Sequence, residues 1–176
     1  MTDALCVEGI TRVARSFRRV ISDGSDLPAR EDMALASLFG GMALANAGLG
    51  AVHGFAGPIG GMFDAPHGAV CGVLLPHVLR TNLQAISTRE PESPMVERFQ
   101  KVAALLTQNP EAAPEEGIDW VRGFVAEVRL PSLSSYGVSE SEIPELVSKA
   151  SASSSMKANP LRLTNEELTA VLRAAL

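Results

Sequence analysis

Residues 46–77 have the sequence NAGLGAVHGFAGPIGGMFDAPHGAVCGVLLPH, which contains every histidine of the 176-residue chain. These histidines are His53, His67 and His77. Glycines surround His53, and a proline and a glycine flank His67. Glycine permits a close backbone approach that a side chain would block, and proline fixes the chain as it enters a helix. The stretch therefore predicts two imidazoles, those of His53 and His67, directed into a shared cleft.

Helical patterns precede this stretch. Apolar residues at helical spacing predict a helix over residues 4–21, and Asp26 with Pro28 provides a cap and a first-turn proline for a second helix that reaches about residue 46. The second helix is rich in alanine and glycine. Because small residues let a neighbouring backbone come close, we expect it to be a buried central helix. Residues 48–68 form a glycine-rich passage to which no helix is assigned.

Further helices are expected after this passage, and no run of residues has the pattern of a strand. One is expected over residues 69–87, one from Ser93-Pro94, and one over residues 114–128. Capping-box spacing marks two more helix starts, at Ser139 with Glu142 and at Thr164 with Glu167. The serine-rich segment 150–158 is expected to be a loop. The sequence therefore predicts an all-α fold, a single domain over residues 1–176 with about seven helices.

The composition excludes several classes of protein. Hydrophobic residues make up 46% and charged residues 20%, which is typical of a globular domain, and the net charge of −5 provides no basic surface for nucleic acid. The apolar stretch 42–75 is interrupted by glycines, prolines and polar residues, so no membrane span is expected. Cys6 and Cys71 lack paired spacing, and no signal peptide is recognisable. We therefore expect a cytoplasmic protein.

Neutral imidazole is a common ligand of iron and zinc, but a single histidine is more often a hydrogen-bonded core or cap residue. We assign His77 such a structural role. Asp64 lies three residues before His67 and is expected to be a solvated loop carboxylate. The glycine pairs near residues 48–50 and 57–61 follow no predicted strand, so they do not indicate a dinucleotide site.

The quoted stretch resembles the signature of the iron-containing (group III) alcohol dehydrogenases, in residues 46–54, 60–68 and 74–77. The similarity continues over essentially the whole chain and implies the dehydroquinate synthase-like helical C-terminal domain of that family. The matching histidines bind the active-site metal in the family, so the resemblance implies that His53 and His67 are metal ligands. The histidine that matches His77 is not a ligand there.

Two departures from the family pattern affect the expected function. Many members have a second histidine where Gly57 stands here, which places a proton-relay role in doubt. The family completes its metal shell with an aspartate and a further histidine, upstream of the segment that matches residues 2–10, and it binds nucleotide in an N-terminal domain. This sequence contains neither. We therefore assign no catalytic and no nucleotide-binding residue, and we expect Fe²⁺ or Zn²⁺ to bind weakly without the additional ligands.

The resemblance implies the metal-binding part of an NAD(P)-linked alcohol dehydrogenase, which is expected to be inactive as this chain alone. NAD(P) would be used only in a complete enzyme. Three alternatives remain: one subunit of a split dehydrogenase, a non-catalytic module for oligomerisation or protein binding, and a small metal-binding protein. The expected partners are a second copy of the chain, or a nucleotide-binding domain or subunit. The choices between Fe and Zn and between NAD and NADP stay open, as does the substrate, with a ketone-acid such as maleylacetate among the candidates.

Overall fold

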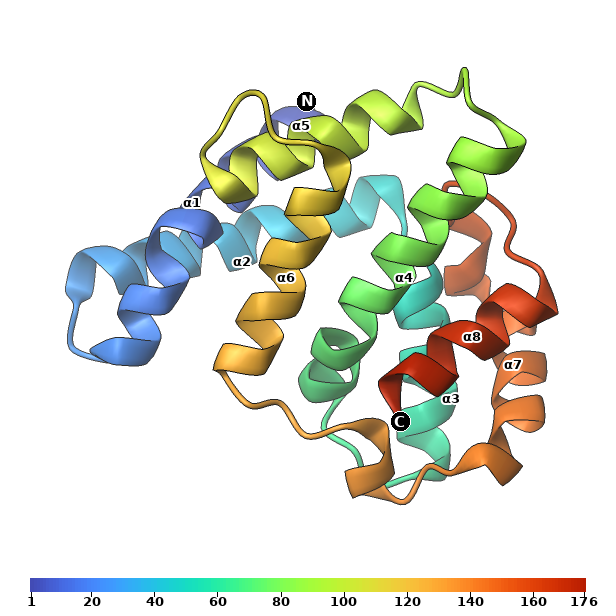
Figure 1. Ribbon diagram of the computed structural model, residues 1–176. Coiled ribbons are helices and arrows are strands. Elements are labelled where there is room, and N and C mark those ends of the chain that lie inside the picture. Colours follow the sequence, from blue (N-terminus) through green and yellow to red (C-terminus); the bar gives the residue numbers. More distant parts are fainter. The chain divides into compact units, whose positions relative to one another are not determined.

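A computed structural model describes all residues from Met1 to Leu176 and contains only helices as regular elements, which confirms the predicted all-α class (Figure 1). Three short 3₁₀ helices accompany the α-helices: η1 (Leu133–Tyr136), η2 (Glu140–Glu142) and η3 (Ser154–Ala158). The α-helices are α1 (Thr2–Ser22), α2 (Leu27–Ala47), α3 (Ala51–Met62), α4 (His67–Arg89), α5 (Met95–Thr107), α6 (Pro114–Glu127), α7 (Ile143–Ala152) and α8 (Asn165–Ala175).

The glycine-rich passage contains a helix, α3, that the sequence analysis did not predict. Ala51, Phe55 and Ile59 are spaced four residues apart and are buried in the core on one face of α3. Glycine lowers helix propensity by about 1 kcal/mol per residue relative to alanine. Here the burial of an apolar stripe overrides that propensity, as tertiary packing often does.

The first turn of α3 is capped by a residue from a distant part of the chain. The Ala51 backbone N–H donates to Oδ1 of Asn159 over 3.0 Å, and Asn159 in turn exchanges two side-chain hydrogen bonds with the buried Asn82 of α4. Gly50 precedes the helix, and a Cβ at this position would lie 3.0 Å from Oδ1 of Asn159. A side chain at position 50 would therefore crowd the cap.

The contacts within the chain divide it into two compact units, residues 1–48 with 97–117 and residues 49–96 with 118–176. In the first unit α1 packs against α2. The expected apolar stripe of α1 is not the buried one, because the fully enclosed positions are Gly9 and Ser16. A Cβ on Gly9 would lie 3.8 Å from the Cβ of Phe39, so a small residue lets the two helices come close.

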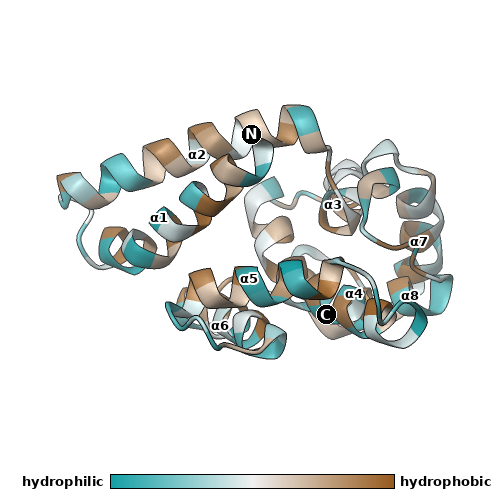
Figure 2. Ribbon diagram, turned by 90° about the horizontal axis from the view of Figure 1, so that it is seen from above, coloured by the Kyte–Doolittle hydropathy of each residue, from teal (hydrophilic) through white to brown (hydrophobic).

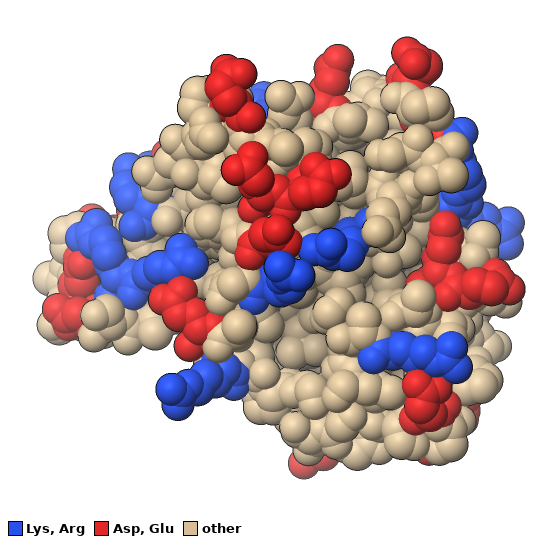
Figure 3. Space-filling view, viewed as in Figure 1, with Lys and Arg blue, Asp and Glu red and all other residues tan.

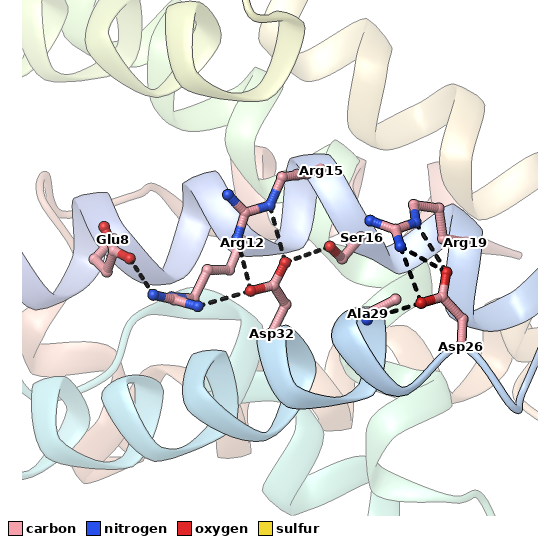
Figure 4. Close-up of polar contacts among 8 residues, drawn as sticks. All are labelled: Glu8, Arg12, Arg15, Ser16, Arg19, Asp26, Ala29 and Asp32. Carbon is pink, nitrogen blue, oxygen red and sulfur yellow. Dashed lines mark hydrogen bonds and ion pairs between the residues drawn. The ribbon is translucent and has the colours of Figure 1, made fainter.

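A buried carboxylate joins α1 to α2 (Figure 4). Asp32 accepts hydrogen bonds from Arg12, Arg15 and Ser16, with N–O distances of 2.7 Å to each arginine. These donors hold the pKa of Asp32 well below its usual range. A second pair, Arg19 with Asp26, closes the end of the hairpin, where Asp26 also caps α2 through the Ala29 N–H.

The expectation of a buried central helix at residues 26–46 is wrong. Only Ala29, Asp32 and Ala43 of α2 are buried, whereas Leu27, Leu38 and Met42 remain 68%, 56% and 44% exposed. The three buried residues of α2 form a single narrow stripe, whereas Gly40 and Gly41 are exposed, and a Cβ added to either would meet no atom within 4 Å. Along the length of α2, hydrophobic and hydrophilic residues follow one another (Figure 2).

The second unit contains the larger hydrophobic core. In it α3 packs against α4, α7 and η3, while α8 packs against α4 and α7. The core includes Phe55 and Ile59 of α3, Val70 and Leu74 of α4, and Leu172 of α8. Exposed ion pairs lie on its surface, among them Arg89 with Glu167 and Arg173 with Glu140. On the face shown in Figure 3, acidic and basic side chains are interspersed.

Both predicted capping boxes are present. Ser139 with Glu142 opens η2, which leads into α7, and Thr164 with Glu167 opens α8. The segment expected to be a serine-rich loop is largely helical, because α7 continues to Ala152 and η3 follows. None of the helices taken singly has the length and apolar composition of a membrane crossing. Only α2 and α3 taken together have that length and apolar composition.

We predict that Asp32→Asn lowers the free energy of unfolding at pH 7 by about 2 kcal/mol, since charged hydrogen bonds are lost. The folded pKa of Asp32 lies below its unfolded value of about 3.9, so its contribution is present above pH 4 and is lost as the pH falls further. The difference between wild type and variant should therefore shrink below pH 4. Urea unfolding followed by circular dichroism at several pH values measures this. The control is Asp3→Asn, which removes an exposed ion pair with Arg98 and should cost less than about 1 kcal/mol.

A second prediction concerns the cap of α3. Asn159→Ala removes the acceptor for the Ala51 N–H and leaves the buried Asn82 unpaired, so it should lower the free energy of unfolding by about 3 kcal/mol. Amide hydrogen exchange in the first turn of α3 should become faster. Asn165→Ala changes an exposed asparagine at the start of α8 and serves as the control. Equal effects of the two substitutions would contradict the role given to Asn159.

Candidate metal site

His53 is the third residue of α3 and is half-buried, in the first turn, which Asn159 caps. Its position is therefore set by the start of a helix that the cap fixes in place. Burial, and secondarily the neighbouring His67, lower the pKa of His53. The neutral imidazole, which is the form that binds metals, is consequently favoured.

His67 is the first residue of α4, and its side chain is exposed. Pro66 stands at the N-cap position, so the proline–histidine–glycine turn begins a helix as predicted. The rings of His53 and His67 lie side by side, with centroids 5.3 Å apart and planes inclined by 50°. The structure thus brings together the two histidines that the sequence analysis had selected.

A third group, Cys71, lies beside both rings, and the sequence analysis did not identify it as part of a site. Its Sγ is 3.5 Å from Nε2 of His67 and 3.8 Å from Nε2 of His53. Burial raises the pKa of its thiol. Cys71 stands four residues after His67, and this spacing on a helix places two side chains on one face. That spacing was the available signal.

The other two candidates lie elsewhere. His77 is half-buried on α4, where burial and then Arg80 and Arg122 lower its pKa. Asp64 is exposed in the turn between α3 and α4. Neither belongs to the group of converging donor atoms that His53, His67 and Cys71 form.

Gly57 occupies the position where many members of the resembled family have a histidine. It is exposed on α3, and a Cβ added there would meet no atom within 4 Å. The fold therefore leaves room for a side chain at this position. Glycine at position 57 provides no titratable side chain, although the fold has space for one.

The three donor atoms of the site all lie within 4.8 Å of one another. Imidazole nitrogen and thiolate sulfur are ligands that Zn²⁺ and related transition-metal ions accept. The site also has an accessible side, because the His67 side chain is exposed. An open coordination position distinguishes catalytic from structural metal sites. The donor set thus fits a divalent transition-metal ion.

Comparison with known proteins identifies the family. The sequence model of the Fe-containing alcohol dehydrogenase family, C-terminal part, matches residues 1–176. The 1,3-propanediol dehydrogenase of Klebsiella pneumoniae is 36% identical over 99% of this chain, and alcohol dehydrogenase 4 of Schizosaccharomyces pombe is 34% identical over 100% of this chain. A crystal structure of a 1,3-propanediol oxidoreductase superposes with a TM-score of 0.89, at 35% identity over 99% of this chain.

The relatives are considerably longer than this chain. It spans 44% of the Klebsiella enzyme, 40% of the yeast enzyme and 45% of the crystallised oxidoreductase. The matched portion is the helical, C-terminal one, in agreement with the fold described above. The chain belongs to the Fe-containing alcohol dehydrogenase family and corresponds to the C-terminal domain of its members.

Proposed function

We propose that this domain supplies His53 and His67 as ligands of the active-site metal ion of an iron-dependent, NAD(P)-linked alcohol dehydrogenase. The observation that carries the proposal is the approach of the two imidazoles, which lie on different helices with ring centroids 5.3 Å apart. The lowered pKa of His53 supports it, because a neutral ring has a free lone pair for a metal. Relatives named 1,3-propanediol dehydrogenase and lactaldehyde reductase support an alcohol or aldehyde substrate.

When bound, the metal ion would act as a Lewis acid toward the oxygen of the alcohol or carbonyl group, while NAD(P) would exchange the hydride. The residues of this domain have a positioning task in that reaction. The Asn159 cap fixes the start of α3, and α4 begins at His67; the two rings lie with centroids 5.3 Å apart. Gly57 contributes no proton-transferring group.

The reaction also requires a cofactor site and further metal ligands, and we assign neither to residues 1–176. We propose that the 176-residue chain alone does not turn over, and that a nucleotide-binding domain or subunit provides the cofactor site and the remaining metal ligands. The substrate would be an alcohol, with its aldehyde or ketone as product. Two free cysteines are compatible with the reducing cytoplasm as its location.

Metal titration of the purified chain tests the ligand assignment. Removing one imidazole takes away a substantial share of the binding energy, so His53→Ala and His67→Ala should each weaken Zn²⁺ or Fe²⁺ binding by about 10-fold to 100-fold. His77→Ala is the matched control, because this histidine lies on α4 outside the donor group, and it should leave the affinity unchanged. Isothermal titration calorimetry under anaerobic conditions measures all four proteins.

The outcome of that titration can contradict the proposal in two ways. Equal affinities of wild type and both ligand variants would remove His53 and His67 from the site, and so would a larger loss in His77→Ala. A separate assay tests the inactivity of the chain alone: with 1,3-propanediol and either NAD⁺ or NADP⁺, no reduced nicotinamide should form. Turnover at rates typical of enzymes would show that the chain holds a cofactor site.

A second candidate function is self-association, favoured by the apolar surface of α2. Leu27, Leu38 and Met42 point to one side of α2 and are 68%, 56% and 44% exposed. Exposed apolar side chains grouped on one face are typical of interaction surfaces. We propose that a second copy of the chain covers them.

Sedimentation equilibrium tests this candidate. The wild-type chain should form a dimer at micromolar concentration, and the double substitution Leu38→Glu, Met42→Glu should weaken it by at least about 10-fold, because two charges would be buried unpaired. Leu75→Glu, an exposed leucine of α4, is the control. A wild-type chain that stays monomeric at high concentration would contradict self-association.

A further inference from the structure

The thiol of Cys71 is the third member of the candidate metal site. It projects from α4 one helical turn after His67, so the two side chains share a face of the helix. His53 reaches the same point from α3. Both imidazoles turn the same ring atom, Nε2, toward the sulfur, at 3.5 Å for His67 and 3.8 Å for His53.

These distances match those between ligands of one metal ion. A zinc ion lies about 2.3 Å from sulfur and about 2.0 Å from imidazole nitrogen, so in a four-coordinate site the sulfur and nitrogen are roughly 3.6 Å apart. The two observed separations bracket this value. The third separation, between the donor nitrogens of the two imidazoles, is within 4.8 Å, so the rings would approach each other as the three atoms reach bonding distance of one ion.

We infer that Cys71 is a metal ligand, which makes this a site of two histidines and one cysteine for a thiophilic divalent ion such as Zn²⁺ or Co²⁺. The inference rests on the proposed metal-binding role of His53 and His67 and adds a donor to it. On binding, the Sγ–metal bond forms as the S–H bond breaks, and the proton leaves to the solvent. Thiolate favours zinc-class ions over hard ions such as Mg²⁺ and Mn²⁺.

A third donor alters what the chain does by itself. Two imidazoles alone should bind a divalent ion weakly, whereas two imidazoles and a thiolate equal the number of protein ligands in catalytic zinc sites. The 176-residue chain should thus bind one zinc-class ion.

The same sulfur–nitrogen distances also accommodate thiol–imidazole hydrogen bonds, which need no metal ion. The two interpretations differ in two measurable properties. A ligand sulfur transfers charge to the metal and is shielded from alkylation, whereas a hydrogen-bonded thiol does neither. Cys6, a free and exposed cysteine on α1, provides the internal control for both measurements.

The test uses Co²⁺ as a spectroscopic probe on the reduced chain. Wild type should show a near-ultraviolet sulfur-to-cobalt charge-transfer band that saturates at one ion per chain. Cys71→Ser and Cys71→Ala should lose the band and bind Zn²⁺ about 100-fold more weakly, while Cys6→Ser retains both properties. Circular dichroism checks that each variant is folded. Without any substitution, Zn²⁺ should protect Cys71 from iodoacetamide and leave Cys6 reactive, as mass spectrometry can measure.

The possible failures are distinguishable. If Co²⁺ binds with visible ligand-field bands that His53→Ala abolishes, but no sulfur band appears, the role of Cys71 is refuted while the two histidine ligands stand. If the band appears but persists in Cys71→Ser, the ligand is Cys6 and the inference is again refuted. If neither Co²⁺ nor Zn²⁺ binds even at millimolar concentration, both the inference and the proposed function fail.

Discussion

The first turn of α3 depends on the side chain of Asn159, which lies 108 residues further along the chain. Its Oδ1 accepts the Ala51 N–H, and the pairing with Asn82 ties this cap to α4. The free N–H groups of a helix start need acceptors, and Gly50 has no side chain that could provide one. One amide thus links the helix that carries His53 to the helix that carries His67 and Cys71.

The helices α3 and α4 determine how the side chains of the candidate metal site are arranged. On α4 the positions of His67 and Cys71 relative to each other follow from helix geometry alone. The position of His53 relative to them follows from the packing of α3 against α4, to which the buried Phe55, Ile59 and Leu74 contribute. Rigid secondary structure on a packed core is the kind of support that holds metal ligands in place.

The α1–α2 hairpin is held in another way. It encloses few apolar side chains and depends on Asp32, whose charge three donors from α1 satisfy. Such a carboxylate specifies which faces of the two helices meet, because any other register would leave it buried without partners. The same register leaves several apolar residues of α2 exposed.

Local signals in the sequence determined much of the fold. Capping boxes at Ser139 and Thr164, the aspartate and proline at the start of α2, and the helical spacing of apolar residues act within a few residues, so they can be recognised without the tertiary structure. The histidine and glycine pattern of residues 46–77 also indicated the family and the two candidate ligands. The sequence predicted one α-helix fewer than the structure contains, because the glycines of α3 made its apolar stripe hard to recognise.

Only the tertiary structure decided what depends on distant contacts. The cap of α3 comes from Asn159, and the exposure of α2 follows from the ion pairs of Asp32. Cys71 joined the site for a related reason: its spacing from His67 is local, but its distance from His53 exists only once α3 packs on α4. Sequence specified which side chains could act, whereas packing between helices specified which of them meet, because burial and charge satisfaction act across the folded chain.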